Sequence, residues 1–320
     1  MLYFYPGFPV IDHHNGSVQF GTAPHSQFFL HDLQPEEAQF VQLLSRVTHQ
    51  RDYEQLRIQS GLSHHQCQTL LDRLSGFPFT TSHPPTTLNS DEVWWARQRG
   101  DQKMTQSRIN AYIRVTGLDR VGFLLARQLV NAGATHIILQ DSKPVTHWDI
   151  HPYPESMLGV LRESAAASLL QSPDCYVYRR LDTIDCDILV RPYRSDMLWA
   201  AHNMSKNRMH LPIILSEADI TIGPLVKPGS TCCLRCVELN MEHHRIPVDH
   251  HDITHHSGVE SILGSYGAAL AAREVLSAVA GLSSALENAS WRVRADTPFP
   301  IVTSWDIDPH CGCTMVDERY

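Results

Sequence analysis

Residues 109–122 read INAYIRVTGLDRVG, and this stretch decides the fold class of the chain. The run Ile109–Val115 has the composition of a β-strand. It leads directly into a turn with glycines at Gly117 and Gly122. An apolar pattern with helical spacing begins at once, over Phe123–Ala132. The stretch therefore predicts a strand, a glycine-rich turn and a helix in immediate succession.

The residues after this helix extend the pattern. Gly133 ends the helix, and His136–Leu139 predicts a second strand that closes on Asp141. Asp141 lies 24 residues after Gly117, near the offset of about 20 at which a Rossmann unit places its ribose-binding acid. This order of elements predicts a Rossmann-like α/β fold.

The turn itself departs from the Gly-x-Gly-x-x-Gly pattern of nucleotide-binding units. In that pattern the first glycine allows the tight turn, the second lets phosphates approach the backbone, and the third lets helix and strand pack. Gly117 and Gly122 hold the first and third positions, while Asp119 holds the second. A carboxylate there would face the pyrophosphate, so we expect the fold together with a disturbed phosphate cradle.

The later chain supports an α/β architecture. Asp187–Val190 and Met209–Leu215 predict buried strands, and Tyr266–Val279 predicts an apolar helix. The small residues of this helix, among them Gly267 and Ala268, suit close packing on a sheet.

Five of the eight cysteines gather in two short clusters near the C-terminus. Cys233-Leu-Arg-Cys236 and Cys311-Gly-Cys313 are separated by 75 residues, counted from Cys236 to Cys311. Two such pairs, brought together by a fold, supply the four thiolates of a closed tetrahedral zinc site. We therefore expect one structural zinc ion. Buried free thiols, or a catalytic thiol in one pair, are the alternatives.

Other potential metal ligands are weaker candidates. Cys232 and His310 stand beside the two pairs as spare ligands. The stretch His243–His256 holds six histidines, with Asp249 and Asp252 between them, and it is expected to be a solvated loop rather than a second transition-metal site. Cys67, Cys175 and Cys186 lie singly in apolar segments and are expected in the core.

The N-terminal region predicts a separate α+β unit over residues 1–82. Two short strands, a helix after Pro35, two further helices and a returning strand give a winged-helix outline. The predicted strands are Ser17–Gly21, Gln27–Leu30 and Phe77–Phe79, and the later helices are Tyr53–Gln59 and one that Ser63 and Gln66 start as a capping box. Residues 83–108 are expected to be a linker, because TTSHPPTTLN at Thr80–Asn89 places two prolines among Ser and Thr with almost nothing apolar. Residues 109–320 form the second domain.

Three roles are open for the N-terminal unit. It can be a packing or dimerisation module, a peptide clamp that adds a strand to an exposed edge, or a DNA-binding domain. The third helix offers only Arg73 as a fixed cation, whereas phosphate contacts dominate DNA affinity. A peptide clamp suits the segment better than DNA binding. Phe28 and Phe29, with Leu70 and Leu74 of the third helix, are then expected to line a groove for the side chains of the incoming strand.

Composition narrows the class of protein. Apolar residues make up 42% and charged residues 19%, the balance of a globular chain. The net charge of −8 argues against a general nucleic-acid or anionic-membrane binder. No apolar run approaches the roughly 18 residues of a transmembrane helix, and MLYFYPGFPV is a poor signal peptide. We expect a cytoplasmic protein with neither nucleic-acid nor membrane partners.

The later motifs carry a resemblance to a known family. A Rossmann turn, then GPLVKPGSTCCLRCVEL at 223–239, YGAALAAREVLSAVAG at 266–281 and HCGC at 310–313 resembles the ThiF family, relatives of ubiquitin-activating enzymes. More narrowly, the zinc motifs are similar to ThiF-like proteins of azole-forming ribosomal-peptide (bacteriocin-type) biosynthesis. These proteins partner YcaO cyclodehydratases and carry an N-terminal winged-helix peptide clamp. The resemblance spans residues 109–314.

The resemblance implies a nucleotide site with several departures. Active members adenylate a C-terminal carboxylate, using a Gly-x-Gly-Gly-x-Gly turn, an Asp-x-Asp, an arginine, a lysine and a magnesium-binding aspartate. Asp141 matches the first acid of the pair, Lys143 replaces the second, and Arg162 falls where the lysine is expected. Arg194 sits near the magnesium position, with Asp196 as the nearest acid. The segment THWDIHPY at 146–153 lacks the family's Asn-Leu-x-Arg-Gln.

These departures imply that adenylation is lost or heavily altered, while all four zinc ligands are present. We therefore predict a degenerate ThiF-like scaffold that binds a precursor or leader peptide and presents it to a YcaO-like or other modifying enzyme, as a homodimer and with no catalytic residue of its own. Gly117, Asp119, Gly122, Asp141 and Arg162 remain the candidate nucleotide contacts. The alternatives are an active ATP-dependent adenylyltransferase, an NAD-dependent oxidoreductase using Asp141, and a winged-helix regulator.

Overall fold

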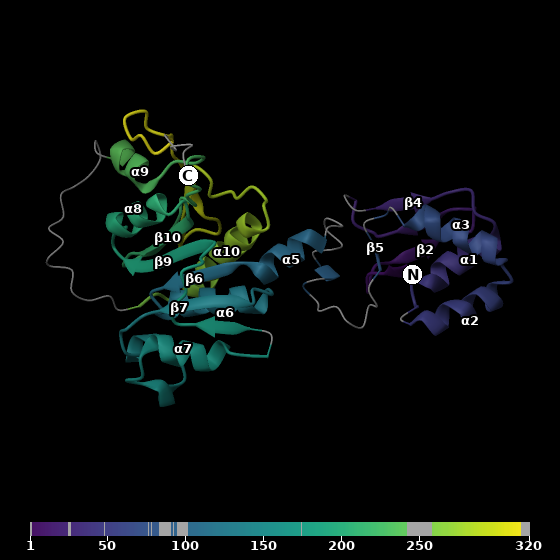
Figure 1. Cartoon of the computed structure of the whole chain (residues 1–320), viewed down its shortest axis with the longest axis horizontal. Helices are drawn as coiled ribbons and strands as arrows, with labels where there is room; N and C mark the ends of the chain where they lie inside the picture. The colour runs from purple at the N-terminus through teal and green to yellow at the C-terminus, as the bar shows by residue number, and fades with distance from the viewer. Residues whose placement is uncertain are drawn as a thin grey trace. The chain divides into compact units, whose positions relative to one another are not determined.

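The computed structural model of the chain describes residues 2–24, 27–47, 49–75, 77, 79–82, 91, 93–94, 102–173, 175–241 and 258–314. The chain divides into two units, Met1–Thr105 and Gln106–Tyr320, shown in Figure 1. The border between them falls within helix α5 (Gln102–Asn110). The predicted histidine-rich loop His243–His256 lies outside the described residues.

Over residues 2–82, the described part of the first unit has two small antiparallel sheets and the helices α1, α2 and α3. Its three-stranded sheet has the order β2–β3–β4, and a second sheet pairs β1 with β5. Its rings and aliphatic side chains form one core, in which Phe20 and Phe79 stack 4.3 Å apart. The elements are β1 (Tyr3–Phe4), β2 (Val10–Asp12), β3 (Val18–Phe20), β4 (Phe28–Leu30), α1 (Pro35–Leu44), α2 (Gln50–Ser60), α3 (His64–Leu74) and β5 (Thr80–Thr81).

Local sequence signals explain the helices of this unit. Pro35 occupies the first turn of α1, as predicted. The capping box at α3 is present, because Ser63 Oγ accepts the N–H of Gln66 and Gln66 Oε1 accepts the N–H of Ser63. The returning strand was predicted at Phe77–Phe79, and this was wrong. Thr80 N–H donates to Phe77 O in a turn, so the strand begins only at Thr80.

The second unit is built on one eight-stranded mixed sheet with the order β13–β12–β11–β10–β9–β6–β7–β8. The five strands from β10 to β8 are parallel, and β11, β12 and β13 extend them antiparallel. The strands are β6 (Tyr112–Thr116), β7 (His136–Gln140), β8 (Tyr176–Tyr178), β9 (Cys186–Pro192), β10 (Met209–Leu215), β11 (Asp219–Ile222), β12 (Ala289–Arg294) and β13 (Ile301–Ser304).

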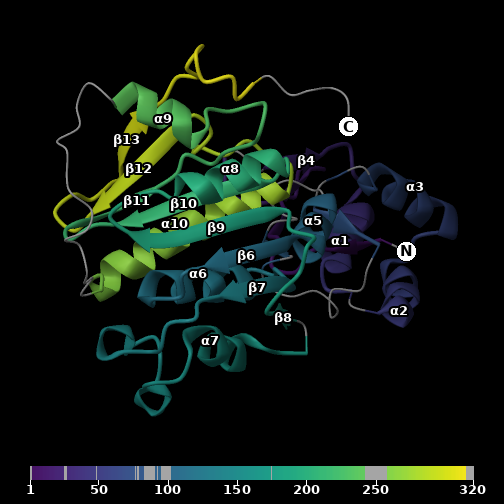
Figure 2. The same ribbon diagram turned by 60° about the vertical axis from the view of Figure 1, so that its left-hand side comes forward.

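Helices cover both faces of this sheet, as in a doubly wound α/β fold. Helices α6 and α10 lie on one face and α8 and α9 on the other (Figure 2), while α7 packs against β7 and α6. Short 3-10 turns at His147–Asp149 and Glu155–Met157 precede α7. The helices are α6 (Arg120–Asn131), α7 (Arg162–Leu170), α8 (Met197–Ser205), α9 (Leu234–Met241) and α10 (Ser261–Val279).

The predicted mixed α/β fold is therefore present, but several predicted boundaries are displaced. The expected linker 83–108 includes most of helix α5, and helix α10 begins at Ser261 rather than at Tyr266. The strand predicted at Ile109–Val115 starts at Tyr112, because the two residues before Ala111 end helix α5. The side chain of Asp185 accepts the N–H of Tyr112 at 2.8 Å, which fixes the start of the strand. The prediction at Met209–Leu215 matches β10 in full.

Helix α10 is long and apolar enough, by length and composition alone, to cross a membrane, although no such run was expected. More than half of it is buried in the protein. Its small residues bring it close to the sheet, since a side chain at Gly267 would meet Ile220 Cδ1 at 2.8 Å. In this structure it is a core helix between α6 and strands β11 and β12.

Candidate functional site

The glycine-rich turn lies at the carboxyl end of β6, where a Rossmann unit binds its ligand. Gly117 has φ +84°, and a Cβ atom there would come within 2.0 Å of Val190 O. At Gly122, a Cβ atom would come within 1.8 Å of Gly117 O. Both positions therefore require glycine, the first for the turn and the second for packing of α6 on the sheet.

Asp119, the residue between these glycines, is the N-cap of α6. Its Oδ1 atom accepts the N–H groups of Val121 at 3.1 Å and Gly122 at 3.2 Å. Free N–H groups at a helix N-terminus are what normally bind a phosphate. In this chain the carboxylate of Asp119 already accepts the hydrogen bonds of these N–H groups.

Asp141, at the end of β7, is also engaged by its own chain. Its Oδ2 atom accepts the N–H of Leu118 at 2.8 Å, and its Oδ1 atom accepts the N–H of Lys143 at 3.0 Å. The side chain of Asp141 is only 6% exposed. These two hydrogen bonds hold the carboxylate against its own turn, at the position where a Rossmann unit binds a ribose hydroxyl.

Arg162, at the start of α7, contributes to the same network. Its guanidinium group is 2.8 Å from Asp149 and 3.3 Å from Asp141. The desolvation cost of burying Arg162 is outweighed by its hydrogen bonds to Asp149, so the pKa of Arg162 is raised. The structure thus brings Asp119, Asp141 and Arg162 together beside the glycine-rich turn that holds Gly117 and Gly122.

Two further members of this network were not predicted from the sequence. Asp149 is buried and accepts the N–H and hydroxyl of Thr146, both at 2.8 Å. Tyr153 is buried, and its hydroxyl donates to Leu118 O at 2.8 Å; burial raises its pKa. The pattern Thr146-x-x-Asp149 is a capping box, which was the available signal.

The expected magnesium position holds no free acid among the described residues. Asp196 caps helix α8, because its Oδ1 atom accepts the N–H groups of Leu198 and Trp199, both at 3.0 Å. Its other oxygen pairs with Arg191 at 2.8 Å. Arg194 is exposed beside it.

The four paired cysteines form one cluster. The sulfur atoms of Cys233, Cys236, Cys311 and Cys313 all lie within 4.8 Å of one another. Tetrahedral geometry with zinc–sulfur bonds of about 2.3 Å places sulfur atoms roughly 3.8 Å apart. Cys233 is 3.4 Å from Cys311 and 3.8 Å from Cys236, so the cluster can hold a metal ion.

The surroundings of the cluster suit thiolates that bind a cation. Burial opposes the charged form of Cys236, but the N–H of Asp308, 3.4 Å from its sulfur, helps to lower its pKa. Burial and the neighbouring thiols raise the pKa of Cys313 to about 11. A cation that binds all four sulfurs must therefore displace protons.

The spare ligands stand apart from this cluster. His310 is largely exposed and pairs with Asp308 at 3.4 Å. Cys232 is buried, but it is not one of the four clustered thiols, and burial raises its pKa to about 12. The remaining cysteines, Cys67, Cys175 and Cys186, are all buried, as predicted.

The three-stranded sheet of the first unit is the part of the structure that the expected peptide clamp would use. Strand β3 is paired on both sides, by β2 and by β4, so β4 is the outer strand on that side. Phe29 of β4 is 42% exposed. Leu70 and Leu74 were expected to line a groove beside it, and this was wrong, because both are at most 1% exposed in the core of the unit.

Comparisons with solved structures support the fold. No family model and no curated protein matches the sequence. The structure is similar to MccB of E. coli, with a TM-score of 0.67 and 12% identity, over 100% of this chain and 99% of that chain. It is also similar to PaaA, with a TM-score of 0.66 and 13% identity, over 94% and 99%. The neighbours support a ThiF-like fold, and identities this low show the fold alone.

Proposed function

We propose that this protein is a peptide-binding scaffold with a degenerate nucleotide site, which presents a precursor or leader peptide to a modifying enzyme. The observation that carries the proposal is the cap formed by Asp119. Its carboxylate holds the two N–H groups of α6 that a phosphate would need. A phosphate about 4 Å from that carboxylate would be repelled by roughly 4 kcal/mol at an effective dielectric near 20.

The neighbouring contacts support the same proposal. Asp141 and Arg162, the expected ribose and phosphate contacts, bond to each other and to the backbone or Asp149. These side chains are already engaged within the chain, so they offer a nucleotide fewer open contacts. Because the carboxylate of Asp141 is already hydrogen-bonded within the chain, the same argument counts against an NAD-dependent oxidoreductase.

A structural zinc ion on the four cysteines fits this role. The sulfur atoms come from the start of α9 and from the segment after β13, which are far apart in sequence. Zinc would cross-link them through four zinc–sulfur bonds, with no open position for catalysis. We place the chain in the cytoplasm, where such thiolates stay reduced.

Peptide binding is assigned to the open edge of β4 in the first unit. An incoming strand would pair its backbone with that edge, and Phe29 would contact its side chains. The solved neighbours favour a peptide partner, since the microcin C7 biosynthetic enzyme MccB was solved in complex with N-formylated MccA. A YcaO-like partner and a homodimer remain parts of this proposal that rest on the sequence.

The second candidate function is an ATP-dependent adenylyltransferase. The observation in its favour is that MccB, similar over 98% of this chain, was solved with ATP. Against it stand the replacement of acids by Lys143 and Arg194 and the cap at Asp119.

Titration of the full chain with ATP and magnesium, followed by ATP–pyrophosphate exchange, separates the two candidates. The scaffold predicts no heat of binding and no exchange, with or without added peptide. Exchange that depends on a peptide carboxylate would establish the adenylyltransferase instead. E. coli MccB, as a relative solved with ATP, serves as the positive control for nucleotide binding.

A further inference from the structure

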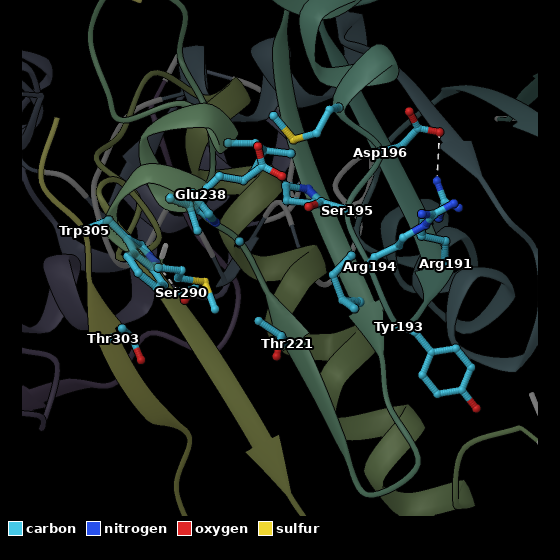
Figure 3. Close-up of a pocket in the computed structure, with 18 of the residues that line it drawn as sticks. Arg191, Tyr193, Arg194, Ser195, Asp196, Thr221, Glu238, Ser290, Thr303 and Trp305 are labelled. Atoms are coloured by element: carbon cyan, nitrogen blue, oxygen red, sulfur yellow. Dashed lines mark hydrogen bonds and ion pairs between the residues drawn. The ribbon is translucent and has the colours of Figure 1, made fainter. Parts of the chain in front are cut away.

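A large cavity lies on the α8 and α9 face of the main sheet, beside the loop after β9 that holds Arg194 and Asp196. Its volume is about 1060 Å³, above the roughly 300–1,000 Å³ typical of small-ligand pockets. Residues of β9 and the loop after it, of β11 to β13 and of α9 surround it (Figure 3). Its size and its position on the sheet suit an extended chain better than a small molecule.

Three arginines line this cavity, and they differ in how closely each one is paired with an acidic side chain. Arg191 is held by Asp196 at 2.8 Å. Arg292 is half-exposed and 3.9 Å from Asp219, a loose ion pair. Arg194 is exposed, and within the described residues its guanidinium group has no ion pair or hydrogen bond. Arg194 and Arg292 are therefore available to an anion.

The acids of the cavity do not cancel this charge. Asp196 is neutralised by Arg191 and by two N–H groups of α8. Glu238 of α9 also lines the cavity, and it pairs with Arg235 at 3.3 Å. The surplus charge of the cavity is positive.

The backbone beside Arg194 is held in an uncommon conformation. Tyr193 has φ +66°, and Arg194 N–H donates to Pro192 O at 2.9 Å, two residues back. A turn closed over so few residues around a bulky side chain with positive φ costs energy and occurs mostly at functional sites. Tyr193 points away from the other labelled side chains, whereas Arg191 extends toward Asp196 (Figure 3).

The remaining walls are suited to a peptide. Hydroxyl groups of Thr221 and Thr303 line the cavity together with the apolar side chains of Pro212 and Ile214. Trp305 closes one side, and its indole N–H donates to Ser290 Oγ at 2.9 Å. An apolar floor with a few polar groups, the exposed Arg194 and the loosely paired Arg292 matches a peptide that carries a carboxylate.

We propose that this cavity binds a carboxylate of the peptide substrate, held by Arg194 and Arg292. The inference rests on the proposed peptide-binding function and deepens it, because it names an acidic peptide segment as the ligand. The planar fork of an arginine matches a carboxylate with two parallel hydrogen bonds. The carboxylate can belong to an acidic side chain or to the peptide's own C-terminus, and the experiment separates these two sources.

The test uses calorimetric titration of the full-length chain at low salt with three acetylated pentapeptides. The first is Ala-Glu-Ala-Phe-Ala with an amidated end, the second is Ala-Gln-Ala-Phe-Ala with a free carboxylate, and the third is that neutral peptide amidated. Inorganic phosphate is a fourth probe. We expect one acidic peptide to bind at least about tenfold more tightly than the neutral amide, and its identity names the source of the carboxylate.

The variants assign this preference to the cavity. The double variant Arg194→Gln/Arg292→Gln should lose the preference, and Arg194→Glu should reverse it. Arg180→Gln removes the same charge from an exposed position after β8, at the opposite edge of the sheet, and should keep the preference. Because these side chains are exposed, the variants should fold, which their far-ultraviolet circular dichroism can verify.

Equal binding of all three peptides, or a preference that survives in the double variant, would overturn the proposal. So would phosphate binding as tight as that of the acidic peptide. Either failure leaves peptide binding at β4 and the absence of pyrophosphate exchange untouched. Conversely, pyrophosphate exchange would refute the scaffold while leaving arginine-dependent carboxylate binding intact.

Discussion

The carboxylate of Asp119 accepts the backbone N–H of Gly122 at 3.2 Å, across the turn that would otherwise face a phosphate. The two residues stand at the second and third glycine positions of the nucleotide pattern. Gly122 keeps its packing role, since only glycine fits against Gly117 O. The turn therefore retains the geometry of a Rossmann unit. Its backbone N–H groups, which would otherwise bind an anion, donate to the side chain of Asp119.

Removing this cap should destabilise the second unit. We expect Asp119→Ala to lower its free energy of unfolding by about 1 kcal/mol, the usual cost of losing an N-cap. Asp119→Asn should have little effect, because asparagine caps equally well. Urea unfolding of the purified chain measures the difference, and Asp296→Ala, at an exposed residue, is the control. An unchanged midpoint in the alanine variant would show that the cap is not needed.

The buried pair between Arg162 and Asp149 should be strongly coupled. Arg162→Met leaves the buried carboxylate of Asp149 without its counter-charge, which costs about 3–5 kcal/mol. Adding Asp149→Asn should recover much of that loss, because the uncompensated charge disappears. A double-mutant cycle on unfolding free energies checks this coupling. Purely additive effects would contradict a direct interaction.

Zinc content should depend on the clustered thiols alone. Elemental analysis should give about one zinc ion per chain, and Cys236→Ser should lower it sharply and destabilise the second unit. Cys175→Ser, at a buried cysteine outside the cluster, should keep the metal. A stable wild-type chain without zinc would refute the site.

Zinc affinity should also rise with pH. The pKa of Cys313 is raised to about 11, so near neutral pH its thiol carries a proton that zinc must displace. Lowering the pH makes this displacement harder, and raising it makes it easier. Competition with a chelator between pH 6 and 8, corrected for the chelator's own protonation, measures the trend. A pH-independent affinity would mean that the thiols are already ionised.

Peptide binding at the edge of β4 should depend on Phe29. We expect Phe29→Ala to weaken a bound peptide about tenfold, equivalent to about 1.4 kcal/mol. Ile58→Ala removes a still more exposed apolar side chain from α2 and is the control. Peptides encoded beside the gene are the probes, with binding followed by amide chemical shifts. Equal weakening by both variants would argue against a specific edge.

Local sequence patterns were enough to predict four of the eight strands of the main sheet, β6, β7, β9 and β10. The apolar run Met209–Leu215 and the turn from Gly117 to Gly122 depend on near neighbours, so periodicity and glycine placement were enough to find them. The two cysteine pairs could also be recognised from the sequence, because closely spaced cysteines in a reducing environment are typical of metal sites. Only their convergence, across 75 residues, needed the fold.

The partners of the charged residues in the candidate site could not be predicted from the sequence, because they depend on the tertiary structure. Asp141 and Arg162 were both found from the sequence, but their engagement with each other and with Asp149 follows from strand ends that meet in space. The burial of Leu70 and Leu74, and the meeting of Arg194 with Arg292 in one cavity, likewise depend on packing between elements. Local pattern specifies which way a backbone turns, whereas the partners of a side chain are set by segments distant in sequence.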